Sequence, residues 1–258
     1  MRFTSHHSDV TVDGETYLRN TGIVPSTLKQ SVSTGVDNLT ISGILSSAEI
    51  TVKDILAERY DFAEVEFFLA DYLLPGAGKI APMKGTLGET QAKGRSFEAE
   101  FRFLIDRLSK KLVELTSRDC RCFDFCDARC GLSKATYTVS STVSSGITPS
   151  RYLFRGTGSP LTSKPDGWFA HGELVWTSGE NAGIKSEVKT FETGTGEIEL
   201  QRALMYPIAI GDSFDVVAGC DRRFETCRDK FDNVINIQAE PHIRGSDYMI
   251  RGVIRNDG

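Results

Sequence analysis

The segment DCRCFDFCDARCG, residues 119–131, and the shorter segment GCDRRFETC, residues 219–227, together hold every cysteine of the chain. The cysteines are Cys120, Cys122, Cys126, Cys130, Cys220 and Cys227. The stretch between the two segments is rich in short β-strand patterns. Because thiolates are the ligands of zinc and of iron–sulfur clusters, two cysteine groups at the ends of one β-rich stretch predict a four-thiolate site that closes a β domain.

Composition narrows the classes of protein to consider. The chain has 258 residues, of which 40% are hydrophobic and 25% charged, as in ordinary globular proteins. The net charge of −5 and the lack of a basic stripe argue against specific nucleic-acid binding. No apolar run is long enough to predict a membrane span, and the N-terminus does not resemble a secretory signal. We therefore expect folding in a reducing cytoplasm, where clustered cysteines bind metals more often than they form disulfides.

The first part of the chain predicts a β-rich domain. Asp13-Gly14 lies between VTV and ETYL, which is a strong hairpin signal. Residues 50–61 predict a short helix, and residues 63–73 predict a half-buried strand because apolar and acidic side chains alternate. Residues 96–103, SFEAEFRF, alternate strictly and predict a second such strand.

The periodicity changes after residue 103. Four leucines are spaced for one face of a helix: Leu104, Leu108, Leu112 and Leu115. This helix would lead directly into the first cysteine segment. We therefore place a domain boundary at residue 118, with an N-terminal β-rich domain over residues 1–118 that ends in a helix.

Residues 119–258 predict a second β domain bracketed by the cysteine site. Six short strand candidates, separated by Gly, Pro, Ser or Asn turns, favour a barrel or a sandwich; they are residues 137–143, 151–154, 167–176, 183–191, 197–204 and 212–219. Residues 221–234 have helical composition and carry Cys227, and residues 242–258 offer one more strand. The expected fold class is mainly β with a few helices (α+β).

Spacing alone leaves the metal open. The patterns C-x-C-x3-C-x3-C and C-x6-C contain no two-residue knuckle, C-x2-C, and fit the usual spacing of structural zinc sites poorly. Wider spacing favours an iron–sulfur cluster, since a cubane needs four thiolates splayed around a larger body, and zinc remains the alternative. Six cysteines exceed the four positions of one site, and the surplus thiols leave room for a disulfide or for unpaired structural cysteines.

Several segments resemble one family. GCDRRFETCRDKFDNVINIQAEPHIRG (219–245), WFAHGELVWTSGENAG (168–183), DARCG (127–131), AERYDFAEVEFFLADYL (57–73) and GTLGE (85–89) are similar to signature segments of tail-hub or tail-tip attachment proteins of long-tailed phages and phage-derived gene transfer agents. Together these segments span nearly the whole chain. The resemblance implies a non-enzymatic structural protein of the virion with a β-barrel-like N-terminal hub domain. It also implies assembly in the host bacterial cytoplasm and a final location at the virion tail tip.

The family also implies partners and a cofactor. Such proteins form homotrimers that join the distal tail protein ring to the central tail fibre or spike, near the tape measure protein. The lambda-like members carry a [4Fe–4S] cluster. Cys130, Cys220 and Cys227 match the family's ligand positions. Relatives usually place the fourth cysteine where this chain has Arg121.

Two cysteines flank that position. We predict Cys122 as the fourth ligand, with Cys120 as the alternative. Cys126 replaces a residue that is commonly glycine in relatives, and it is a second alternative for the fourth position. The predicted site is therefore Cys122, Cys130, Cys220 and Cys227.

Two other functions are alternatives to the tail hub. One is a zinc-stabilised β binding module. The other is a tail-tip cell-wall hydrolase, but no cysteine here has a local nucleophile signature. Among the few histidines, we expect His171 at the surface of a strand and His242 beside the cysteine site as an outer hydrogen-bond donor.

Overall fold

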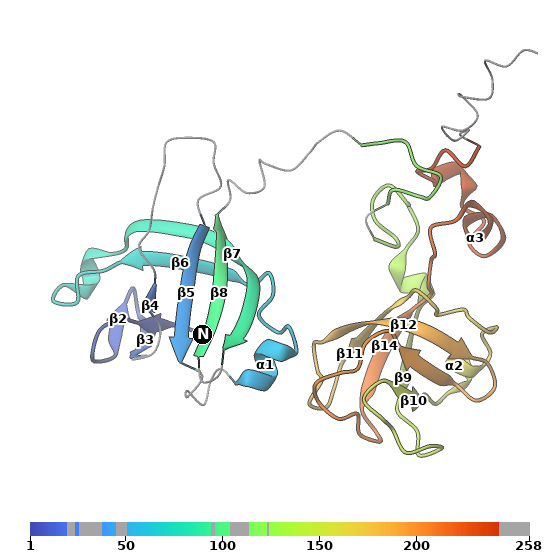
Figure 1. Cartoon of the computed structure of the whole chain (residues 1–258), viewed down its shortest axis with the longest axis horizontal. Helices are drawn as coiled ribbons and strands as arrows, with labels where there is room; N and C mark the ends of the chain where they lie inside the picture. Colours follow the sequence, from blue (N-terminus) through green and yellow to red (C-terminus); the bar gives the residue numbers. More distant parts are fainter. Residues whose placement is uncertain are drawn as a thin grey trace, which may run out of the picture. The chain divides into compact units, whose positions relative to one another are not determined.

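The computed structural model describes residues 1–19, 24–25, 38–44, 51–93, 96–103, 114–122 and 124–242. The chain divides into two compact units, Met1–Leu112 and Val113–Gly258. Strands dominate both units and the described helices are short (Figure 1), which confirms the mainly β fold class. No helix within the described ranges is long and apolar enough to cross a membrane.

The first unit contains a curled five-stranded sheet, which forms a half-barrel in Figure 1. Its order is β4-β5-β8-β7-β6, and all neighbouring strands are antiparallel. The strands are β4 (Val24–Pro25), β5 (Asn38–Ile44), β6 (Glu64–Leu69), β7 (Ile80–Lys93) and β8 (Ser96–Phe103). The register of β7 against β8 shifts between Leu87 and Thr90, and such irregularities increase the local twist of a sheet.

A smaller three-stranded sheet has the order β1-β3-β2. It consists of β1 (Phe3–Thr4), β2 (Val10–Val12) and β3 (Glu15–Arg19). The predicted hairpin joins β2 to β3, and both turn residues have positive φ, 53° at Asp13 and 81° at Gly14. Left-handed conformations at both central positions are what a tight type I′ hairpin turn requires.

Other local predictions for the first unit are also confirmed. The predicted helix is α1 (Val52–Leu56), which begins after Thr51, whose side chain accepts a hydrogen bond from the Asp54 N–H. In β8, Ala99 and Phe101 are buried and alternate with partly exposed charged residues. A short 3-10 helix, η1 (Pro75–Ala77), connects β6 to β7. Most of the helix predicted from Leu104 lies outside the described residues.

The second unit is a six-stranded antiparallel barrel. Its strands are β9 (Thr138–Thr142), β10 (Leu153–Arg155), β11 (Glu173–Trp176), β12 (Lys185–Glu192), β13 (Glu197–Leu200) and β14 (Ser213–Val217). The order is β10-β13-β12-β11-β14-β9. A bridge between Val143, just after β9, and Gly156, just after β10, joins the two outer strands. The sheet therefore closes on itself, and barrel is the correct choice between the two predicted architectures.

Alternation along the strands fills the barrel with apolar side chains. Phe154, Trp176 and Phe214 are almost fully buried at its centre. Their ring centroids lie 5.1–5.7 Å apart, the range of favourable aromatic pairs. The core cluster combines strand residues with residues of their connections, such as Leu161 on α2 and Phe169, and it contains no cysteine.

Among the described residues, four short helices accompany the barrel: α2 (Ser159–Thr162), α3 (Phe224–Asp229), η3 (Lys134–Tyr137) and η4 (Val234–Asn236). The predicted helical segment around Cys227 is α3, so that prediction is confirmed. The two cysteine segments and α3 gather beside one end of the barrel (Figure 1).

One prediction for the second unit needs correction, and another falls mostly on residues that the structure does not describe. Residues 167–176 do not form one strand, because only Glu173–Trp176 is extended. The preceding residues turn tightly, with a hydrogen bond from the Gly172 N–H to the Phe169 carbonyl (2.8 Å) and a φ of 64° at His171. His171 is therefore on a turn, although it is exposed as expected. The strand predicted for residues 242–258 falls outside the described residues after His242.

Candidate metal centre

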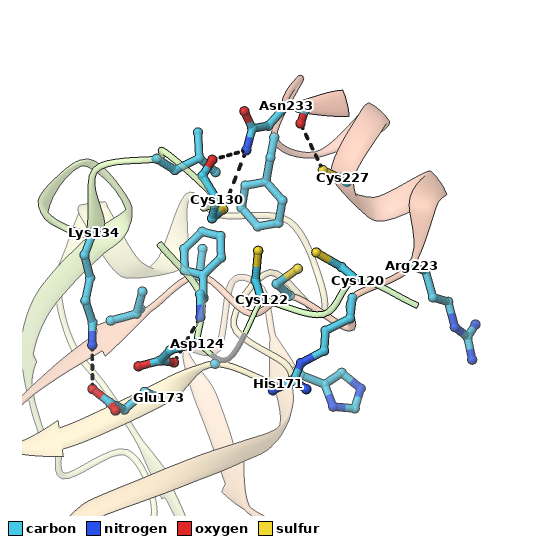
Figure 2. Close-up of a pocket in the computed structure, with 18 of the residues that line it drawn as sticks. Cys120, Cys122, Asp124, Cys130, Lys134, His171, Glu173, Arg223, Cys227 and Asn233 are labelled. Atoms are coloured by element: carbon cyan, nitrogen blue, oxygen red, sulfur yellow. Dashed lines mark hydrogen bonds and ion pairs between the residues drawn. The ribbon is translucent and has the colours of Figure 1, made fainter. Parts of the chain in front are cut away.

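Five of the six cysteines line one cavity of about 310 Å3 beside the barrel: Cys120, Cys122, Cys130, Cys220 and Cys227. Three come from the first cysteine segment, one follows β14 and one lies on α3. Figure 2 shows the labelled thiols converging on a common space from different segments. All four predicted ligands are in this set. Their binding of a metal remains a prediction, and within the described ranges no three His, Cys, Asp or Glu side chains form a group that could hold a single ion.

Backbone hydrogen bonds join the first cysteine segment to two later segments. The Cys120 N–H donates to the Arg222 carbonyl (2.8 Å), and the Arg121 N–H donates to the Gln238 carbonyl (2.9 Å). The Glu240 N–H donates to the Ser117 carbonyl (2.8 Å). Backbone hydrogen bonds therefore hold the residues just before the barrel strands beside the residues that follow them.

An ion-pair group reinforces this junction. The Arg121 guanidinium binds Glu240, with Nη2 2.9 Å from Oε1, and also lies 3.4 Å from a carboxylate oxygen of Glu114. Arg129 also pairs with Glu114 and donates a hydrogen bond to the Arg121 carbonyl (2.7 Å). The hydrogen bond from Arg121, followed by the bond from the Ser117 N–H, lowers the pKa of Glu240. Arg121, which lies between Cys120 and Cys122 in the sequence, is thus engaged away from the cavity.

Asn233 connects the cysteines of the two segments. It is buried, and its Nδ2 donates to the Cys130 carbonyl (2.7 Å) and lies 3.6 Å from the Cys130 sulfur. The Cys227 thiol donates to the Asn233 carbonyl (3.3 Å), and Asn236 donates to the Asn233 side-chain oxygen (2.7 Å). Asn233 therefore contacts two predicted ligands, Cys130 through its side-chain amide and Cys227 through its backbone carbonyl (Figure 2). The sequence interpretation did not single out Asn233, although it lies within the signature segment 219–245.

The position of Cys220 is set by a close backbone approach. A Cβ on the preceding Gly219 would lie 1.6 Å from the Ala170 carbonyl oxygen, so only glycine fits. Lys230 fixes the same junction, because its Nζ donates to the carbonyls of Trp168 (2.5 Å) and Gly219 (2.6 Å). Its ammonium also lies 4.8 Å from the Trp168 ring centroid. Burial lowers the pKa of Lys230 to about 8.

Burial also governs the thiols. It is the largest cause that raises the pKa of Cys227 to about 11, followed by the neighbouring thiols of Cys220 and Cys120. Burial and the hydrogen bond to Cys120 raise the pKa of Cys122 well above its ordinary value. These thiols are therefore protonated near neutral pH, and a metal that binds them must displace the protons.

Cys126 differs from the other five thiols because it does not line the cavity. Its φ is 67°, in the left-handed region that favours glycine. A glycine at position 126 would adopt this conformation without steric cost.

The wall facing the barrel is polar. Glu173 on β11 accepts hydrogen bonds from Lys134 (2.7 Å) and Lys185 (3.3 Å). Burial alone would raise the pKa of Glu173, but these two cations lower it, so the carboxylate stays ionised. His242 does not line the cavity, and its ring lies 6.0 Å from the Phe224 ring.

Comparisons with known proteins define the class. Residues 1–133, more than half of the chain, match the family described as baseplate hub protein, N-terminal attachment domain. Residues 167–247 match the family described as phage conserved hypothetical protein BR0599. The chain therefore belongs to the phage baseplate hub protein family, a family of structural virion proteins.

One solved structure makes the likeness more particular. A chain in the virion of a native gene transfer agent particle is 32% identical over 96% of this chain and 85% of that chain, with a TM-score of 0.80. No curated protein matches. The resemblance to tail-hub proteins of phages and gene transfer agents is thereby confirmed, as is a place in the virion.

Proposed function

We propose that this chain is the tail-tip hub that joins the distal tail protein ring to the central fibre or spike. The observation that carries the proposal is the match to a virion chain over 96% of the sequence, which includes both units. The N-terminal residues match an attachment domain. Membership of this family supports a structural rather than an enzymatic role.

The proposed assembly is a homotrimer that contacts the distal ring, the central fibre or spike and the tape measure protein. Mass photometry of the purified chain, alone and with the ring protein, tests this arrangement. A trimer that appears alone or on the ring is expected. A chain that stays monomeric with the ring protein present contradicts the proposal.

We further propose a structural [4Fe–4S] cluster held by Cys122, Cys130, Cys220 and Cys227. The donor set fits a cluster, since the cavity presents more than four thiols from separate segments. The walls are partly apolar, with Phe125 and Phe231 4.8 Å apart. N–H donors also face the sulfurs, because Asn233 Nδ2 lies 3.6 Å from the Cys130 sulfur and the Gln238 nitrogen lies 3.4 Å from the Cys120 sulfur, and such hydrogen bonds tune cluster sites.

The size of the cavity supports a cluster over zinc. A zinc ion with four thiolates at about 2.3 Å leaves no internal space, whereas the thiols here line part of a cavity of about 310 Å3 that has room for a larger group. When bound, the cluster would add four metal–thiolate bonds between segments that hydrogen bonds already join. The residues of the chain would position those thiolates and shield them from solvent.

Anaerobic purification followed by metal analysis tests the cofactor. We expect iron and acid-labile sulfide in equal amounts, and absorbance at about 400 nm from a thiolate-bound cluster. Zinc without iron or sulfide would overturn the cluster and favour the zinc-stabilised alternative.

A further inference from the structure

The cavity contains one thiol more than a cubane cluster needs, and the surplus lies within one short segment. Cys120 and Cys122 both line the cavity, whereas Arg121 between them pairs with Glu240 outside it. Alternate residues of an extended chain point to the same side, which explains why both thiols face inward.

The two thiols also contact each other. The side chains of Cys120 and Cys122 are hydrogen-bonded, and Cys122 is the more buried of the two. The Cys120 sulfur accepts a hydrogen bond from the Gln238 N–H (3.4 Å). A metal centre that reaches one sulfur therefore has the other sulfur next to it.

From this geometry we infer that Cys120 and Cys122 are interchangeable ligands for a single corner of the cluster. The inference rests on the proposed [4Fe–4S] site. Either thiolate completes the set formed by Cys130, Cys220 and Cys227, and the other thiol stays free beside the metal. The site is thereby complete with either thiolate, although Arg121 between them pairs with Glu240 outside the cavity.

The other three corners have no such substitute. No second cysteine lies within three residues of Cys130, Cys220 or Cys227. Cys126 is near Cys130 in sequence but does not line the cavity. Replacement of any of these three ligands should therefore remove the cluster, whereas a single replacement within the pair should not.

Serine variants test the inference directly. The variants are Cys120→Ser, Cys122→Ser, the double variant, and Cys126→Ser and Cys227→Ser as controls. Each full-length protein is purified and reconstituted anaerobically with iron and sulfide, and iron and acid-labile sulfide are measured per folded chain. Size-exclusion chromatography and circular dichroism select folded protein.

We expect wild-type iron content in both single variants and in Cys126→Ser, and loss of iron in the double variant and in Cys227→Ser. Loss of iron in one folded single variant would overturn interchangeability and leave the cluster standing with one fixed ligand. Full iron content in the double variant would exclude both thiols as ligands. A wild-type chain that takes up no iron would overturn the cluster itself, so the two failures are distinguishable.

Alkylation of the holoprotein gives a second measurement that does not depend on variants. N-ethylmaleimide should add one label per chain within the pair, and mass spectrometry should find it on Cys120 in some molecules and on Cys122 in others. Cys126 serves as the internal control for a thiol outside the site. A label confined to one member of the pair contradicts the inference.

Discussion

Replacement of Gly219 by alanine would place a methyl carbon inside the backbone of the adjoining turn. The new Cβ would lie 1.6 Å from the Ala170 carbonyl oxygen, 2.4 Å from its carbon and 2.7 Å from the Gly172 nitrogen. All three obstructing atoms are backbone atoms, so no side-chain rotation relieves the overlap. The turn must move, although hydrogen bonds hold it, from the Gly219 N–H to the Trp168 carbonyl (3.0 Å) and within residues 169–172.

The expected magnitude follows from these contacts. Overpacking of a well-packed site costs about 1–3 kcal/mol, and the backbone overlap places Gly219→Ala at the upper end, about 3 kcal/mol. At about 2–4 °C per kcal/mol for a protein of this size, Tm should fall by about 6–12 °C.

A matched control lies in the same unit. Gly146 has no positive φ, and a Cβ there would meet its nearest atoms, on Arg155 and Ser144, at an ordinary 3.5 Å. Gly146→Ala should therefore leave stability unchanged or raise it by about 0.4–1 kcal/mol. The assay is thermal unfolding by tryptophan fluorescence, which reports this unit because both tryptophans, Trp168 and Trp176, belong to it. Equal Tm values for the two variants would refute the close approach that positions Cys220.

Three further substitutions test the contacts around the cavity. Lys230→Met should destabilise the second unit. The pKa of Lys230 is about 8 in the folded protein and 10.5 as its ordinary value, so between these values the unfolded chain binds more protons and the wild type should gain stability relative to the variant as pH rises. A constant difference in urea unfolding between about pH 8 and about pH 10 would contradict this expectation. Asn233→Asp removes the amide donor to the Cys130 carbonyl and should cost about 1–3 kcal/mol in urea unfolding, whereas equality with the wild type would rule out the bridging role. Glu240→Gln should be less stable than the wild type above the ordinary glutamate pKa, and this difference should disappear as pH falls through the lowered pKa of folded Glu240. In thermal unfolding, the Tm values of the wild type and the variant should therefore converge in acid. A Tm difference that persists in acid would count against the Arg121–Glu240 pair.

Local patterns were sufficient where neighbours in sequence decide the structure. The strict alternation of residues 96–103 predicted β8, and the Asp13-Gly14 pair predicted the β2–β3 hairpin. Both depend on the side-chain period of a strand or on the positive φ of a turn. The spacing of short strands after residue 137 likewise predicted a barrel or a sandwich. It could not distinguish the two, because the deciding Val143–Gly156 bridge is a pairing between the two outer strands of the sheet.

Contacts between distant residues explain what the patterns missed. Residues 168–172 alternate like a strand, but the approach of Gly219 and the positive φ of His171 require a turn. Asn233 and Lys230 act on carbonyls 103 and 62 residues away, and no local period records such a partner. The cysteine groups did predict a shared site, but a spacing of two residues gives Cys120 and Cys122 the same orientation, so sequence alone provides no basis for separating them.

The structure changes how a cluster would contribute to this fold. The positions of the cysteines in the sequence predict that the site closes the domain, and closing a long loop by a disulfide stabilises a fold by roughly 3–5 kcal/mol. The barrel, however, closes through its own strands, and Cys120, Cys130 and Cys220 are positioned by backbone and side-chain bonds that involve no metal. A metal that binds only the folded protein stabilises it by an amount set by the binding affinity. Ligands that the fold already holds in place lose less conformational freedom when the metal binds, so the affinity is higher. The cluster should therefore tighten the segments beside the barrel, while the barrel core keeps its fold without it.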